Sequence, residues 1–378
     1  MVSYSSMPDL DAESSLLDIT INVVSDIEDL NKYSSSWDLI NKALPHQNPL
    51  MSFEWIVTFI ETQIAFNTKW TVFICMSGPK LMAVLPIIIK STKRFGITYQ
   101  QAELPFDDQT MSVDMLVSPG FENNLIKPII KSVYHTHKNV ALILFRRIDE
   151  KSNVLNAYCS ILGSHIEYCE SGGSIAIPDD YVSFRNKLAK NFKSNLNKAS
   201  NKAIKAGGIE FFDDDLDGLS AVEKLKIVCE LEHSGWKGRS GSSILSSPKD
   251  LDFYQRLVER LEISGMLHFS FLKLGGKVVA GNLGVKHGSK LLLWKLAYDD
   301  EYKKYSPGGL LLEKLIEKNV ESNEFSIIDL MTGESWYKNW NMNWRRFNNV
   351  YLFKFGLIGL YIKTILIAKK ITNHFRNN

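Results

Sequence analysis

This chain of 378 residues contains only four cysteines, and few of its histidines lie close together in the sequence. Only His135 and His137 lie close together among the eight histidines, and their spacing does not match a helical metal site. The cysteines have neither the spacing of a disulfide framework nor that of metal ligands. We therefore expect no metal ion in this protein. We interpret the cysteines as buried thiols of a cytoplasmic protein; they are Cys75, Cys159, Cys169 and Cys229.

Long apolar segments are also missing. The first 28 residues are polar and acidic, unlike a secretory signal. The segment Phe353–Lys370 is apolar but interrupted by basic residues, and it is too short to cross a bilayer, which takes about 20 apolar residues. Two interpretations stay open for this tail: an interfacial helix on an anionic membrane, or a C-terminal helix packed on the N-terminal half.

Acidic residues are absent from two long stretches of the sequence. Tyr181–Ile209 contains seven basic residues and Ser335–Asn378 contains eight, although the net charge of the whole chain is only +2. Such segregation indicates anionic partners for particular faces. A nucleic acid is not expected, because the sequence shows no basic platform studded with aromatic residues and no base-reading motif.

The length predicts two domains. The N-terminal part alternates apolar strands with helices, as at the hairpin Trp70–Ile89, the helix Leu125–His135 and the strand Val140–Phe145. Gly172-Gly173 marks the predicted linker. After it, Tyr181–Ile209 has a helical pattern with one apolar face and a basic remainder. That basic face is either solvated or a clamp for the phosphates of coenzyme A or of a phosphorylated substrate.

The segment Leu267–Lys338 is the most informative. Gly275-Gly276 and His287-Gly288-Ser289 supply the turns of a three-stranded meander, which ends at Tyr298. A helix then opens at Ser306-Pro307-Gly308-Gly309 and is followed by the apolar strand Phe325–Leu330. Proline suits the first helical turn, and two glycines let a ligand approach backbone N–H groups without intrahelical partners. These donors lie at the positive end of the helix dipole, so the pattern predicts a site for an anionic pyrophosphate.

Several short motifs in this region resemble the GNAT acyltransferase superfamily, and more closely its FemAB-like branch found beside bacterial cellulose and exopolysaccharide synthesis genes (the CelD/BcsL-like proteins). The resemblance covers about half of the chain, in the order and spacing of that branch. Lys303, Lys304 and Ser306 depart from the usual Arg or Gln followed by spaced glycines. The matching motifs are Trp236-Lys237, Gly265–His268, Gly276–Gly281, Ala297–Asp299, Tyr305–Leu311, Asp329–Gly333 and Tyr337-Lys338.

The resemblance implies an α/β fold of tandem GNAT-like domains, each with a mixed central sheet flanked by helices. Residues 1–171 would be a degenerate domain without cofactor, residues 172–350 the acyltransferase domain, and residues 351–378 a basic amphipathic helix. The co-substrate would be acyl-CoA, most simply acetyl-CoA, or an acyl carrier protein. Its cradle would comprise Tyr298, Lys303, Ser306, Pro307, Gly308, Gly309 and Leu310.

Catalytic candidates follow from residue chemistry beside these motifs. Asp329 is a carboxylate within an apolar strand, so it is either paired or has a raised pKa; it is a catalytic candidate or a structural anchor for a cation. Tyr337 could return a proton to the thiolate, and Lys338 could hold a phosphate. His233 is a possible general base, with a capping or core role as its alternative. Glu334 completes the predicted catalytic set.

Aromatic residues near these candidates suggest substrate contacts. Trp236, Lys237 and Arg239 lie in a loop that could close over a substrate. Trp336 and Trp340 could contact a sugar or simply pack over the strands. The acidic loop Glu103–Gln109 is either solvated or part of a cleft between the halves.

The predicted function is acyl transfer to an amine or hydroxyl of a sugar, or of a sugar-linked intermediate, in cell-surface polysaccharide synthesis. Two alternatives remain: a FemAB-type transferase that uses aminoacyl-tRNA, and a non-catalytic partner of a membrane glycan synthase. The expected location is cytoplasmic, with possible attachment to the inner membrane face through the tail.

Overall fold

The computed structural model describes residues 18–45, 47–94 and 96–377, with the backbone alone for 369–377. All thirteen strands of this part of the chain belong to one sheet, in the order β1-β2-β3-β4-β6-β13-β7-β12-β11-β10-β9-β8, and β5 pairs with β3. Parallel pairs (β4 with β6, β11 with β12) occur among antiparallel ones. The predicted α/β class, with a mixed sheet and flanking helices, is confirmed.

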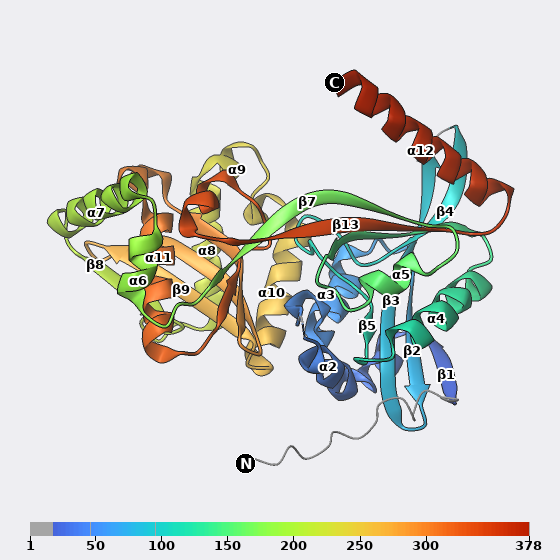
Figure 1. Ribbon diagram of the computed structural model, residues 1–378. Coiled ribbons are helices and arrows are strands. Elements are labelled where there is room, and N and C mark those ends of the chain that lie inside the picture. The colour runs from blue at the N-terminus through green and yellow to red at the C-terminus, as the bar shows by residue number, and fades with distance from the viewer. Residues whose placement is uncertain (1–17, 46, 95, 378) are drawn as a thin grey trace, which may run out of the picture.

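The molecule has two halves joined by a pair of long strands (Figure 1). The N-terminal half contains β1 (Ile19–Val24), α1 (Ile27–Asn31), α2 (Ser34–Ala43), η1 (Pro49–Met51), α3 (Phe53–Gln63), β2 (Lys69–Ser77), β3 (Lys80–Arg94), β4 (Ile97–Glu103), β5 (Leu116–Val117), α4 (Glu122–Thr136), β6 (Val140–Asp149) and α5 (Leu155–Cys159).

The C-terminal half contains α6 (Tyr181–Lys187), α7 (Lys190–Lys205), β8 (Ile209–Asp213), α8 (Ala221–Ser234), α9 (Trp236–Arg239), η2 (Ile244–Ser246), α10 (Pro248–Ile263), β9 (Leu267–Leu274), β10 (Lys277–His287), β11 (Lys290–Tyr298), η3 (Asp300–Tyr305), α11 (Pro307–Ser322), β12 (Ile327–Asp329) and η4 (Ser335–Trp340). The joining strands are β7 (Ser164–Ala176) and β13 (Asn343–Phe353), and α12 (Leu357–Asn377) follows them.

The joining strands make the sheet continuous. β7 pairs with β13 along most of its length and with β12 at its end, while β13 also pairs with β6 of the N-terminal half. Gly172 and Gly173, interpreted as a linker from the sequence, lie inside β7. A Cβ at Gly172 would lie 2.5 Å from the carbonyl oxygen of Met331, and one at Gly173 would lie 1.7 Å from Met342. Close packing therefore requires these glycines, and they do not form a flexible connection.

One hydrophobic core runs through both halves. Trp55 of α3 packs edge-on against Phe253 of α10, with 6.0 Å between ring centroids, and contacts Trp294 of β11 at 4.4 Å. Arg260 of α10 also donates to Thr58 of α3 at 2.8 Å. The two halves are thus held in a fixed relation by buried aromatic contacts as well as by the shared sheet.

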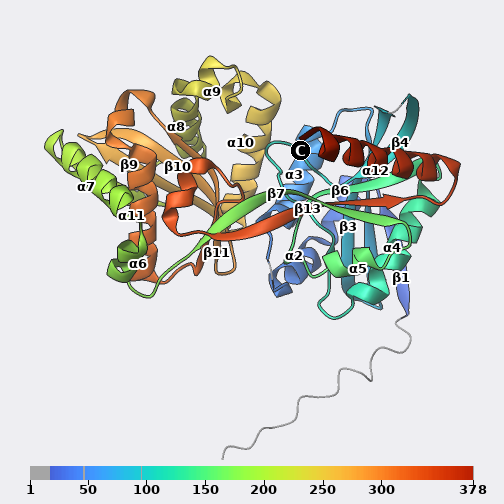
Figure 2. The ribbon, with the colours of Figure 1, turned by 45° about the horizontal axis from the view of Figure 1, so that its top comes forward.

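In the C-terminal half, helices cover both faces of the sheet (Figure 2). Leu291 and Leu293 of β11 pack toward α6 and α11, whereas Leu292 and Trp294 belong to the core that includes α8 and α10. The basic segment predicted as one helix is two, because Leu188 and Ala189 take extended backbone angles between α6 and α7.

Candidate functional site

The N-terminus of α11 forms an open cradle of backbone donors. Ser306 precedes it in a left-handed conformation (φ 50°), Pro307 occupies its first position, and its first turn contains no acidic residue. Within the described chain, no side chain caps this end of α11. The first helical bond there is from Leu310 N–H to the Ser306 carbonyl, 3.0 Å, so the N–H groups of Gly308 and Gly309 are left for another acceptor.

The two glycines of the cradle have different roles. A Cβ at Gly308 would lie 3.0 Å from the Leu296 side chain of β11, so this glycine lets the helix approach the strand. A Cβ at Gly309 would lie 2.9 Å from Ser306 Oγ, inside the cradle itself. Both features fit the pyrophosphate of acyl-CoA, because an anion needs close access to these donors.

Helix α7 packs beside the cradle. Its Ala199 and Ala203 share a buried cluster with Leu310 and Leu311 of α11, and Tyr298, Tyr302 and Tyr305 pack against the same cluster. Within the described chain, the lysines of α7 make no ion pair with a carboxylate. Those on its exposed surface are Lys190, Lys198, Lys202 and Lys205, and Lys303 of η3 is exposed as well. Exposed lysines therefore lie on both elements next to the cradle, together with Asp300 and Glu301 of η3.

The strands β11 and β12 separate next to the cradle. Their parallel pairing covers Lys290–Leu292 and Ile327–Asp329 only. A β-bulge follows at Trp294, because β10 pairs Leu283 with Lys295 and Gly284 with Leu293. From the bulge to Tyr298, β11 no longer pairs with β12. The backbone N–H and C=O groups on that edge of β11 can therefore form hydrogen bonds with another molecule.

A buried charge cluster that sequence reasoning missed lies beside the bulge. The Lys295 side chain is 15% exposed, and its ammonium lies 4.0 Å from Glu232 Oε1 of α8. Lys237 of the Trp236-Lys237 motif donates to the same oxygen at 2.6 Å, and Ile244 N–H donates to the other oxygen at 2.9 Å. Burial, together with the Lys237 charge, lowers the pKa of Lys295 to about 8. A lysine in an otherwise apolar strand was the signal in the sequence.

This cluster lies near the loop Glu103–Gln109 from the N-terminal half. Gln109 accepts hydrogen bonds from the Tyr254 hydroxyl through its side chain, 2.5 Å, and from the Trp294 indole through its carbonyl, 3.0 Å. Tyr254 stacks on Trp294 with 4.4 Å between centroids. The acidic loop therefore forms part of the junction between the halves.

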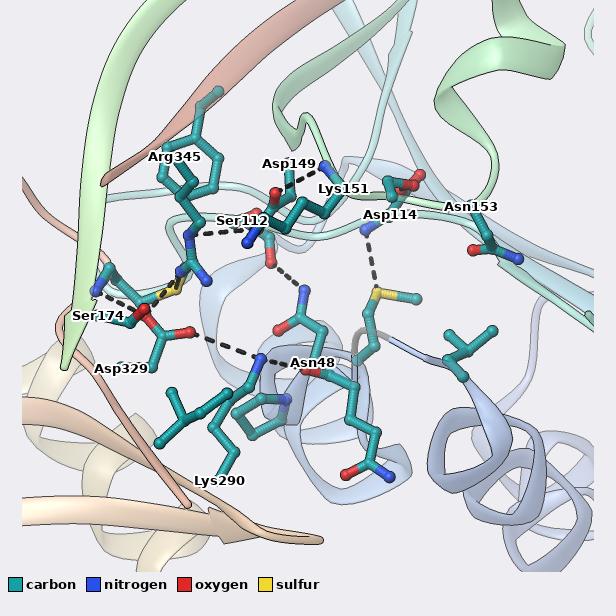
Figure 3. Close-up of a pocket in the computed structure, with 18 of the residues that line it drawn as sticks. Asn48, Ser112, Asp114, Asp149, Lys151, Asn153, Ser174, Lys290, Asp329 and Arg345 are labelled. Atoms are coloured by element: carbon teal, nitrogen blue, oxygen red, sulfur yellow. Dashed lines mark hydrogen bonds and ion pairs between the residues drawn. The ribbon is translucent and has the colours of Figure 1, made fainter. Parts of the chain in front are cut away.

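Asp329 lies in a polar cavity of about 150 Å³ between the halves (Figure 3). Arg345 donates to its Oδ1 at 2.6 Å, and Lys290 lies 3.7 Å from its Oδ2. Burial would raise the pKa of Asp329, but Arg345 and Lys290 outweigh burial and hold that pKa below its usual range. The carboxylate is thus paired, and its contacts favour the structural-anchor interpretation, since a carboxylate of lowered pKa is a weak proton acceptor near neutral pH.

A second carboxylate lines the same cavity from the N-terminal half. Asp114 accepts from the Tyr158 hydroxyl at 2.9 Å and from the Ser152 hydroxyl, and burial raises its pKa to about 6. Asn48 lies between the two carboxylates in Figure 3 and donates to the Ser112 carbonyl at 2.8 Å. Such a set of oxygens and amides suits a small polyhydroxylated ligand.

The other predicted catalytic residues are dispersed. Glu334 and Lys338 line a shallow surface groove beside β7 and β13. Tyr337 is buried, and its pKa is raised by burial. His233 lies at the end of α8, where its Nδ1 is 2.8 Å from Ser243 Oγ. The structure does not bring these residues to Asp329; Glu334 lies beside Lys338 in the groove and accepts a backbone hydrogen bond from Tyr337, 3.0 Å.

The predicted substrate-binding residues are also divided. Trp236 is exposed on α9, and Arg239 of the same short helix pairs with Asp300 of η3 at 2.7 Å, which links this segment to the cradle. Trp340 is buried and packs against Phe192 of α7, 5.0 Å between centroids, while Trp336 is partly exposed. The Trp236–Arg239 segment and the cradle therefore form one site region.

Comparison with known proteins is consistent with this geometry. Residues 190–339 match the family model described as acetyltransferase (GNAT) domain. No curated protein matches the chain. The fold is similar to the crystal structure of FemX (13% identity, 83% of this chain and 95% of that one, TM-score 0.59). It is also similar to a conserved protein of unknown function from Bacteroides thetaiotaomicron (11% identity, 89% and 100% coverage, TM-score 0.53).

Proposed function

We propose that this chain, whose residues 190–339 form an acetyltransferase (GNAT) domain, transfers an acyl group from acyl-CoA to an amine or hydroxyl of a sugar or sugar-linked acceptor. The enzyme class and the acyl-CoA co-substrate follow from the family. The observation that carries the assignment of the site is the uncapped α11 N-terminus beside the open edge of β11.

The donor would be held by the N–H groups of Gly308 and Gly309 and by the positive end of α11. Acyl-CoA supplies a thioester carbonyl, which the acceptor nitrogen or oxygen attacks. The open edge of β11 after Leu292 offers backbone N–H groups that can stabilise the resulting oxyanion. No side-chain triad is needed for this arrangement.

Lys295 is the residue we propose as general base. Its pKa of about 8 leaves an appreciable neutral fraction near neutral pH, and it projects beside the bulge at Trp294. Glu232 would position its ammonium after it takes the proton from the acceptor, while Lys237, bound to the same carboxylate, keeps the pKa of Lys295 low. This role differs from the sequence prediction, in which His233 was the possible general base and Asp329 a catalytic candidate.

The polar cavity between the halves supports the sugar-linked part of the proposal. Asp114, Asp149, Asn48 and Asn153 line it from the N-terminal half, and Ser174 and Asn343 from the joining strands. The asparagine and serine side chains can both donate to and accept from hydroxyls, and the ionised carboxylates can accept. Involvement in cell-surface polysaccharide synthesis is part of the same proposal.

A screen of donor and acceptor pairs tests the function. Purified protein would be incubated with acetyl-, succinyl- or longer acyl-CoA and with amino sugars, neutral sugars or nucleotide sugars, and products would be identified by mass spectrometry. We expect one acyl group to be added to a sugar, with release of free coenzyme A. Acyl transfer only to non-sugar amines would refute the acceptor class, and transfer only from aminoacyl-tRNA would refute the donor.

A further inference from the structure

Helix α12 has apolar residues on two opposite faces. Ile362 is fully buried, and Leu366 packs against the same cluster, which includes Tyr99 of β4 and Tyr351 of β13. Figures 1 and 2 show the helix lying against the N-terminal half. The other face, which points away from this cluster, is apolar as well. It carries Leu357 (88% exposed), Leu360 (63%) and Tyr361 (44%).

This exposed face continues beyond the helix. Phe355, 75% exposed, lies at the meeting point of two grooves. One groove, of about 600 Å³, is lined by Leu357 and Ile358 of α12. The other, of about 450 Å³, is lined by Leu162, which is 76% exposed. Exposed apolar residues gathered in one place on a protein surface indicate an interaction site.

The charge of the surrounding surface identifies the partner. Lys138 and Lys354 line the first groove, and Lys127 and Lys131 line the second. Neither groove is lined by an Asp or a Glu among the described residues. Exposed apolar residues framed by lysines complement an anionic lipid surface, where the apolar groups enter the headgroup boundary and the lysines meet phosphates.

We propose that the exposed face of α12, together with Phe355, Leu162 and the flanking lysines, binds the surface of an anionic lipid bilayer. No helix among the described residues is long and apolar enough to span a membrane. Because α12 is also packed on the N-terminal half through Ile362, the protein binds as a folded body. The inference is independent of the acyl donor and acceptor.

Co-sedimentation of the full chain with vesicles tests the inference. We expect binding to phosphatidylglycerol–phosphatidylcholine vesicles, weak binding to pure phosphatidylcholine, and partial release by 1 M salt, because screening shortens the Debye length to about 3 Å. A variant with Leu357, Leu360 and Tyr361 replaced by Ser should lose most binding. A variant with Lys127, Lys131 and Lys138 replaced by Gln should bind anionic vesicles about 100-fold more weakly.

Matched controls remove similar groups elsewhere. Phe66→Ser removes a fully exposed aromatic residue from another loop, and a variant with Lys80, Lys226 and Lys318 replaced by Gln lowers the net charge equally. Both should bind as the unaltered chain does, and circular dichroism and thermal melting should show that all variants are folded. Equal binding to neutral and anionic vesicles, or unchanged binding by the serine variant, would overturn the proposal. So would a concentration-dependent dimer that covers this face and excludes lipid.

Discussion

Each half of the molecule contains a helix between two parallel strands, and the N-termini of these helices differ. In the N-terminal half, α4 lies between β4 and β6 in the chain, and its first turn carries Glu122. That carboxylate accepts from Gly120 N–H at 3.2 Å and from the Asn153 amide at 2.7 Å. In the C-terminal half, α11 lies between β11 and β12 and has no acidic residue in its first turn, while neither helix has a side-chain cap at its N-terminus in the described chain. The comparison indicates which half can accept an anionic ligand.

The central strands of the two halves also differ, in how the charge of a buried side chain is compensated. Glu103 of β4 is buried, but Lys90 and Arg146 each lie 3.2 Å from it. Burial would raise its pKa, and these two cations outweigh burial and lower it. Lys295 of β11 has one carboxylate, Glu232, at 4.0 Å, and that carboxylate is already held by Lys237. Two cations thus neutralise Glu103, while Lys295 is left poised to change protonation.

Among the variants that test this comparison of the two halves, Lys295→Met should have the largest effect on turnover. If neutral Lys295 is the base, turnover falls by about 100-fold or more, with acetyl-CoA affinity unchanged. In the unaltered enzyme the rate should rise with pH and level off above about 8, and the variant should lose this dependence. Steady-state kinetics across pH 6–9.5 and calorimetry of donor binding measure both effects.

A matched control is Lys273→Met in β9, a lysine with similar burial (13% exposed) that pairs with Asp217. It should retain full turnover and the same pH profile. Full turnover by the Lys295 variant would show that the buried cluster is only structural.

Asp329→Asn tests whether Asp329, in the C-terminal half, is a buried carboxylate neutralised by cations, as Glu103 is in the N-terminal half. Its loss leaves Lys290 buried without its carboxylate and leaves Arg345 with Asp149 alone, so we expect unfolding in urea to require about 3 kcal/mol less. Because the folded pKa is lowered, Asp329 stabilises the fold above its unfolded pKa of about 3.9 and loses that contribution as pH falls further. The stability of the variant should therefore fall less below pH 4.

Turnover of the folded fraction separates the two interpretations of Asp329. Near-normal turnover would establish the anchor, whereas a loss of about 100-fold with unchanged stability would restore the catalytic role predicted from the sequence. Both quantities must be measured on the same preparation.

Local patterns in the sequence were sufficient to predict much of the C-terminal half. Gly275 and Gly276 adopt the positive φ values of the predicted turn (57° and 80°), and the strands beside it have the predicted bounds within a few residues. The α11 N-terminus was predictable because proline and glycine act through their own backbone angles. These features depend on neighbours in the chain.

Features that depend on distant residues were not predictable. Gly172 and Gly173 looked like a linker because nothing nearby shows that Met331 and Met342 will pack against them. The role of Lys295 depends on Glu232, which reaches it from another element. The catalytic candidates Glu334, Tyr337 and Lys338 were grouped by their proximity in sequence, yet a short helix places Tyr337 in the core and Lys338 in a surface groove.

Gly309→Val should break the cradle directly. The added side chain enters the space beside Ser306 Oγ and blocks access to the N–H groups of the first turn. Losing two charge-assisted hydrogen bonds of about 1.5 kcal/mol each predicts an affinity for acetyl-CoA about 100-fold weaker in calorimetry. Asn124→Val at the corresponding position of α4 should leave the affinity unchanged. Equal affinity of the Gly309 variant and the unaltered chain would refute the assignment of the cradle.

The smallest effects are expected from variants that add a carboxylate to the N-terminus of α11 or remove one from the N-terminus of α4. Ser306→Asp introduces a carboxylate at the N-terminus of α11, where the left-handed backbone tolerates Asp. Acetyl-CoA affinity should fall about 10-fold, or about 1.4 kcal/mol, because the carboxylate repels the pyrophosphate, while stability stays equal or rises by up to ~1 kcal/mol. Ser306→Asn is the neutral control and should bind nearly as the unaltered chain does.

Glu122→Gln makes the reciprocal change in α4. It removes a negative charge from the first turn, where the positive end of the helix dipole favours it, so stability in urea should fall by about 0.3–1 kcal/mol, without a change in donor affinity. If Glu122→Gln created a second acetyl-CoA site, the two helix ends would be equivalent, and the absence of a carboxylate alone would explain binding. If instead Ser306→Asp left the affinity unchanged, the positive end of α11 would contribute little, and the lysines of α7 and η3 would become the main candidates for holding the phosphates.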